Sequence, residues 1–181
     1  YFPYFKPDGA GGAVYGWYEN AGHRNAFVQQ INAAGTKRWA TDYGLPVTLD
    51  PGTTSGAISA SMAYNQVTGD IFCSFERVSL PVQSQWGVSV QKIDSAGNLA
   101  WGPFGTEVSP LDPNQEAFDT TVLGPDGGCY VIGFEGRAAA GISVSGVVRA
   151  ALVNAAGATV FSPAMTEVCS ELLPKGRLWA A

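Results

Sequence analysis

Three glutamates recur at nearly regular intervals, and each has an arginine a few residues away. They are Glu19, Glu76 and Glu135, followed by Arg24, Arg77 and Arg137. A carboxylate and a guanidinium on one rim of a repeated unit can hydrogen-bond a sugar hydroxyl or a peptide group. The alternative is that the pairs are solvated salt bridges, each worth about 0 to 1 kcal/mol. These six residues are candidate ligand-binding side chains.

One tryptophan extends this candidate set. Trp86 lies in the polar stretch "PVQSQWG", which predicts an exposed indole. A flat aromatic face can cover the apolar face of a pyranose ring. Trp86 is therefore a candidate sugar-stacking platform.

The residues needed for nucleophilic or metal chemistry are sparse. His23 is the single histidine, and Cys73, Cys129 and Cys169 form no C-x-x-C pair. The three cysteines fit either three thiols or one optional disulfide and a thiol. No Asp-x-Asp-x-Asp-Gly calcium loop occurs. The sequence predicts no catalytic residue, no metal ligand and no cofactor.

A glycosidase would need two facing carboxylates. Glu116 and Asp119, beside the recurring glutamates, are the candidates for such a pair. The enzyme alternative is therefore a carbohydrate-active hydrolase or lyase that further units would complete.

Composition limits the partners and the location. The net charge is −5 and the ten Lys and Arg residues are scattered, so no basic stripe is available for nucleic acid. No apolar run approaches the roughly 20 residues of a membrane span. A low charged fraction of 14% with an acidic balance is common in secreted and surface proteins. Because residue 1 is Tyr and not Met, we expect a removed signal segment or a longer parent chain.

The elements that must position these residues come from a threefold repeat. Its clearest sign is one turn written three times, as "NAAGTKRW" at 32–39, "DSAGNLAW" at 94–101 and "NAAGATVF" at 154–161. The turn glycines lie 62 and 60 residues apart, so the unit is about 60 residues long.

Each unit divides into four short strands. The second strand is "AVYGWYE", "DIFCSFE" or "CYVIGFE", apolar at nearly every position, which indicates a strand covered on both faces. The third is "AFVQQIN", "VSVQKID" or "VRAALVN", and the recurring turn joins it to the fourth. We expect Trp39, Trp101 and Phe161 to begin the fourth strand and to pack between neighbouring sheets.

Four strands per unit are typical of a β-propeller blade. A solenoid usually has shorter repeats, and sandwich domains need about 100 residues each. We therefore predict an all-β fold of three four-stranded antiparallel blades: blade one at 1–53, blade two at 54–113 and blade three at 114–172. Residues 173–181 would begin a further blade or form a swapped strand.

Three blades do not close a ring, since propellers have four to eight. Either the chain is part of a longer polypeptide, or two copies associate as a homodimer with "RLWAA" (177–181) as an exchanged strand.

The units resemble a degenerate repeat of large secreted and cell-surface bacterial propeller-like proteins. The likeness rests on "PDGAGGAVYGWYEN", "VQQINAAGTKRW" and "YGLPV" in unit one and covers nearly the whole chain. Unit two lacks the double glycine, and unit three has Phe161 for Trp. The resemblance implies architecture and an extracellular location, but no single function.

The predicted function is a non-catalytic secreted or surface module that binds a protein or a glycan. A structural module of an extracellular filament or surface assembly is the second alternative, and the hydrolase or lyase is the third.

Overall fold

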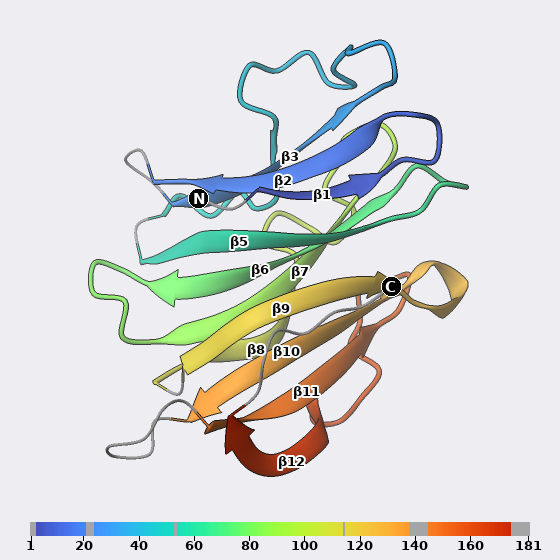
Figure 1. Cartoon of the computed structure of the whole chain (residues 1–181). Coiled ribbons are helices and arrows are strands. Elements are labelled where there is room, and N and C mark those ends of the chain that lie inside the picture. Colours follow the sequence, from blue (N-terminus) through green and yellow to red (C-terminus); the bar gives the residue numbers. More distant parts are fainter. Residues whose placement is uncertain (1–2, 21–23, 53, 114, 138–144, 175–181) are drawn as a thin grey trace.

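A computed structural model describes residues 3–20, 24–52, 54–113, 115–137 and 145–174 of the chain. Side chains of residues 115–119, 134–137, 145–146 and 170–174 are outside this description. Three four-stranded antiparallel sheets lie one above another, the first blue, the second green and the third yellow to red (Figure 1).

The strands follow the chain order within every sheet. The first sheet contains β1 (Tyr4–Pro7), β2 (Ala13–Glu19), β3 (Asn25–Ile31) and β4 (Leu45–Pro46). The second contains β5 (Ser55–Tyr64), β6 (Ile71–Ser79), β7 (Trp86–Ile93) and β8 (Thr106–Asp112). The third contains β9 (Gln115–Leu123), β10 (Cys129–Arg137), β11 (Ser145–Val153) and β12 (Thr166–Pro174), with a short 3-10 turn at Pro125–Gly127.

This arrangement confirms the predicted all-β fold of three four-stranded antiparallel units. The middle sheet shows why its second strand is apolar at most positions: seven of the nine residues in 71–79 are buried on the two alternating faces, and only positions 77 and 79 are partly exposed. The tail "RLWAA" and His23 lie outside the described residues.

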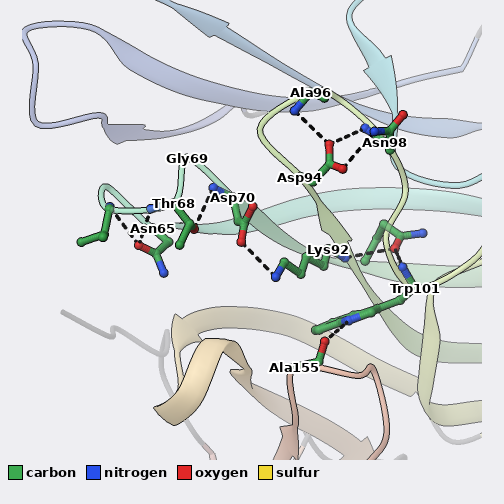
Figure 2. A network of polar contacts seen from close by, with 12 residues as sticks. Asn65, Thr68, Gly69, Asp70, Lys92, Asp94, Ala96, Asn98, Trp101 and Ala155 are labelled. Carbon is green, nitrogen blue, oxygen red and sulfur yellow. Dashed lines mark hydrogen bonds and ion pairs between the residues drawn. The ribbon is translucent and has the colours of Figure 1, made fainter.

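The recurring turn is held by one side chain in the same way three times. Asn32 Oδ1 accepts from the backbone N–H groups of residues 34 and 36, at 3.0 and 2.9 Å. Asp94 does the same for residues 96 and 98, both at 2.9 Å (Figure 2), and Asn154 for residues 156 and 158, both at 3.0 Å. A short Asn or Asp is needed for this local geometry, which explains why the motif begins with one each time.

The fourth strands differ from the prediction, because Trp39 and Trp101 do not begin them. Strand β4 starts six residues after Trp39, and β8 starts five residues after Trp101. The reason is a buried glutamine on the third strand. Gln29 Nε2 donates to Trp39 O at 3.0 Å, and Gln29 Oε1 accepts from Trp39 N at 3.3 Å, so a side-chain amide replaces a strand in the ladder.

The second unit uses the same device. Gln91 Oε1 accepts from Trp101 N at 3.1 Å, and Gln91 Nε2 donates to Gly102 O at 2.8 Å. In the third unit Ala151 takes the glutamine position and Phe161 takes the tryptophan position. Glutamine and tryptophan are therefore lost together.

Neighbouring sheets are related in the same way at both junctions. The first strand of each following sheet contacts three strands of the preceding one: β5 contacts β1, β2 and β3, and β9 contacts β5, β6 and β7. One core, with Val14, Val28, Phe75 and Ile93, lies between sheets one and two. A second core, with Phe72, Val90, Val131 and Val153, lies between sheets two and three.

Candidate functional site

The three recurring glutamates do not share one position in the fold. Strand register aligns Ala13, Ile71 and Cys129, which face Ile31, Ile93 and Val153 across the second and third strands. Counting from these residues, Arg77 and not Glu76 is equivalent to Glu19 and Glu135. Because side chains alternate along a strand, Glu76 belongs to the opposite face of its sheet. The predicted common phase is wrong for Glu76.

In the first two units, whose glutamate and arginine side chains are described, the arginines form other contacts than the predicted pairs. The Trp17 indole N–H donates to Glu19 at 3.3 Å, and Arg24 Nε donates to Asn20 at 2.8 Å. Arg77 forms an ion pair with Glu107, which lies on β8. Adjacent residues of one strand point to opposite faces, so a glutamate and the following arginine cannot readily pair.

The remaining sequence candidates are placed as follows. Glu76 is buried, with only 7% of its surface exposed. Trp86 begins β7 and pairs with Val78 and Asp112. It is half-buried, so its indole is less accessible than the exposed sugar-stacking platform predicted from the sequence. The backbone of Glu135 and Arg137 lies in β10, but their side chains, like those of Glu116 and Asp119, are outside the described residues.

A cleft of about 170 Å³ surrounds Arg77 at one end of the first two sheets. Its walls come from four segments: the chain after β4, the start of β5, the end of β6 and the loop before β8. The lining residues are Thr48, Asp50, Ser55, Gly56, Ala57, Phe75, Arg77 and Phe104.

Backbone contacts fix these walls relative to one another. Leu49 N donates to Pro103 O at 2.7 Å, which ties the chain after β4 to the loop that carries Phe104. Ala57 N donates to Arg24 O at 2.9 Å, so the chain of Arg24 borders the same end. The structure thereby brings two sequence candidates, Arg24 and Arg77, to one end of the sheets, although only Arg77 lines the cleft.

The cleft contains donors, acceptors and one exposed aromatic ring. Asp50 accepts from Gly52 N at 2.9 Å and from the Ser55 hydroxyl at 2.5 Å. The Arg77 Nε is buried and has no acceptor among the described residues. The Phe104 side chain is 57% exposed. A ligand oxygen could accept from Arg77 while an apolar ligand face lies on Phe104.

This arrangement suits binding better than acid–base chemistry. Asp50 already accepts two hydrogen bonds, and Glu107 is already paired with Arg77. A glycosidase needs one carboxyl group that holds a proton for the leaving group. Both carboxylates are already engaged by donors of the protein itself, and Glu107 does not line the cleft, so the geometry favours binding.

Sequence reasoning identified Arg77 but missed the rest of the cleft. Asp50 and Ser55 lie in "LDPGTTSG", a polar connection between two units that carries no repeated signal. Phe104 lies in the loop before β8, and the exposure of its side chain depends on the path of that loop. The sequence signal that could have indicated these cleft residues is the polar, Gly-rich connection between two repeats.

Other titratable groups have structural explanations. The backbone N–H of Ala10, followed by the side chain of Gln30, lowers the pKa of Asp8, and the side chain of Asn98 lowers that of Asp94. Burial raises the pKa of the Cys129 thiol to about 12. Cys73 and Cys129 are buried and Cys169 is half-buried, and none of the three forms a disulfide.

Within the described residues, no group of three or more His, Cys, Asp and Glu side chains could hold a metal ion. The same part of the chain contains no helix of the length and hydropathy that a membrane crossing requires.

No protein-family model matches this chain, and no curated protein matches its sequence.

Proposed function

We propose that the three sheets are consecutive blades of a β-propeller-type array. The supporting observation is that β1, β5 and β9, the first strands, adjoin in series, while contact between the outer strands β4 and β8 is weak or absent. Strands that converge on one side and diverge on the other are what a radial arrangement requires. The domain limits 1–53, 54–113 and 114–172 remain predictions within this arrangement.

The array acts as a non-catalytic module that binds a glycan through the Arg77 cleft. The observation that carries this proposal is the combination of the partly exposed Arg77 guanidinium, which lines the cleft, with the exposed Phe104 ring. Small-molecule pockets usually measure about 300 Å³ or more. A cleft of about 170 Å³ therefore takes one terminal sugar ring and leaves the rest of the glycan in solvent.

An extracellular location agrees with this function, because glycans are displayed there. The low charged fraction of 14% and the resemblance to secreted bacterial propeller-like repeats support the same proposal.

The test uses a glycan array followed by titration calorimetry on the oligosaccharide that binds best. Phe104→Ala should weaken binding about tenfold, which corresponds to about 1.4 kcal/mol. Arg77→Gln should weaken it at least as much, because a charge-assisted hydrogen bond is lost. Tyr43→Ala is the matched control, since Tyr43 is 70% exposed and does not line the cleft.

Two results would refute the glycan proposal. One is an array with no bound glycan at any concentration tested. The other is a bound glycan whose affinity is unchanged in Phe104→Ala and in Arg77→Gln. Turnover of the glycan during the titration would contradict the non-catalytic assignment.

A structural module is the second candidate function. It is favoured by one specific observation, the large apolar side chains exposed on the outer face of the first sheet: Phe5 at 63% and Tyr15 at 39%. Spacer modules that stack end to end need such faces.

A further inference from the structure

One contact between sheets occurs twice in this chain. A Cβ built on Gly97 would lie 2.7 Å from Trp39 Nε1, so the indole of unit one lies directly on the turn glycine of unit two. A Cβ built on Gly157 would likewise lie 2.7 Å from Trp101 Cδ1. The Trp101 indole N–H also donates to Ala155 O at 3.1 Å, as Figure 2 shows. The first and second units thus each place an aromatic ring on the turn of the next unit.

The first unit offers the same turn without an occupant. A Cβ built on Gly35 would meet no heavy atom of the described structure within 4 Å. Its backbone is the same as that of its equivalents, with φ of +79° against +95° at Gly97 and +83° at Gly157. The turn that receives an aromatic ring is therefore present and open in unit one.

The outer face of the first sheet has the composition of an inter-sheet face. By register, Phe5 is equivalent to Met62 and Tyr15 to Cys73, and these partners in the second sheet are 1% and 0% exposed. Phe5 and Tyr15 are 63% and 39% exposed, and their rings stack with centroids 6.3 Å apart. Trp17 and Phe27 form a second stacked pair at 6.0 Å on the same face. Four aromatic rings occupy positions that a preceding sheet would bury.

The third sheet carries the complementary half of this contact. Its outer face is apolar and half-buried: Tyr130, Ile132, Ala150 and Leu152. Phe161 stands four residues after Gly157, as Trp39 and Trp101 follow their turn glycines. The equivalents of Ala150 in the first two sheets, Val28 and Val90, are fully buried against the next sheet. A single chain therefore holds both halves of an interface that it already forms twice.

We propose that a second copy of this chain docks head to tail, with the outer face of its third sheet on the outer face of the first sheet and its Phe161 over Gly35. The choice of a second copy follows from continuity with the two internal junctions. A heterologous contact of this kind closes into a pair if the rotation allows and otherwise extends into a filament. This interface is independent of the Arg77 cleft, so either proposal can fail without the other.

The experiment measures mass by sedimentation velocity on the 181-residue chain. Concentrations from about 1 µM to about 1 mM cover association free energies of about −8 to −4 kcal/mol. The mass should rise from 18.9 kDa toward at least twice that value as concentration increases. Phe5→Glu and Phe161→Glu should each remain monomeric, because each places a charge in the apolar contact. Val67→Glu is the control, since Val67 is 94% exposed in the turn between β5 and β6.

Mixing the two variants separates head-to-tail docking from pairing of like faces. Phe5→Glu keeps an intact third sheet, and Phe161→Glu keeps an intact first sheet. The mixture should therefore form a heterodimer that neither variant forms alone. Near-ultraviolet circular dichroism verifies that each variant is folded, and Ile132→Lys replaces Phe161→Glu if the latter is not.

The proposal is overturned if the wild-type chain stays at 18.9 kDa over the whole range. It is also overturned if Phe5→Glu abolishes association while Phe161→Glu and Ile132→Lys leave it intact, because two first sheets would then be pairing with each other. Failure of the mixture to associate, with both variants folded, contradicts it as well.

Discussion

Alanine substitution at the three turn glycines isolates the contact that joins the sheets. Gly35, Gly97 and Gly157 share a positive φ, so alanine is strained at all three to the same degree. They differ in their surroundings, since only Gly97 and Gly157 have an indole 2.7 Å from the position of a new Cβ. Gly35→Ala is therefore a matched control for the backbone strain.

The expected magnitudes follow from these two effects. A left-handed alanine costs roughly 1 to 2 kcal/mol, of which about 0.4 to 1 is recovered because the unfolded chain loses freedom. Gly35→Ala should therefore lower the free energy of unfolding by about 1 kcal/mol. Overpacking against a ring that cannot move freely adds about 1 to 3 kcal/mol. Gly97→Ala should accordingly cost about 2 to 4 kcal/mol, since Trp39 is only 9% exposed and is held by Gln29.

Urea denaturation monitored by tryptophan fluorescence measures the free energy of unfolding of each variant. The chain is kept at low micromolar concentration, so that association of two copies at Gly35 does not contribute. Gly157→Ala should resemble Gly97→Ala and lower the free energy of unfolding by more than Gly35→Ala does. Its loss should be the smaller of the two, because Trp101 is more exposed than Trp39 and can shift further. Equal losses for Gly35→Ala and Gly97→Ala would refute the stacking of tryptophan on glycine as the link between sheets.

Three further predictions concern the glutamine, the turn carboxylate and the thiols. Gln91→Leu should lower stability by about 1 to 3 kcal/mol in urea melts, because two buried backbone groups lose their partner; an equal or higher stability would contradict this. The pKa of Asp94 is lowered in the folded chain, so its contribution is present above the ordinary carboxyl pKa and is lost as pH falls through the folded value. The advantage of the wild type over Asp94→Asn in melts at neutral pH should therefore vanish in acid, and a constant gap would disprove the assignment. Burial and a pKa near 12 should protect Cys129 from iodoacetamide at pH about 8 while Cys169 is labelled, as peptide mass spectrometry would show; labelling of Cys129 in the folded chain would count against its burial.

Local chemistry made the repeated turns and the second strands predictable. An Asn or Asp at the start of each turn and a glycine three residues later need only neighbouring backbone to act. Mostly apolar strands such as 71–75 can be recognised because burial on both faces removes the alternation of apolar and polar residues. These features depend on a few adjacent residues, so the sequence alone contains them.

The sequence does not predict where the fourth strands start or which residues are equivalent to the glutamates, and the two reasons differ. The fourth strand starts late because Gln29 and Gln91 satisfy backbone groups from a distance of ten residues, which no local pattern reports. The glutamates were aligned by the similar letters "YE" and "FE", 57 residues apart, whereas the ladder repeats at 58 from Ala13 to Ile71. A slip of one residue changes the face of a sheet, so a small error in alignment removed Glu76 from the predicted set.

The paired loss of glutamine and tryptophan in the third unit indicates that they work as one device. The Gln91 amide fixes the backbone of Trp101, and the fixed backbone holds the indole over Gly157. With Ala151 at the glutamine position, an indole would have no such support, and the smaller Phe161 ring takes its place. The first two units hold the next sheet with the full device, and the weaker anchor of the third unit fits the concentration-dependent docking that we propose.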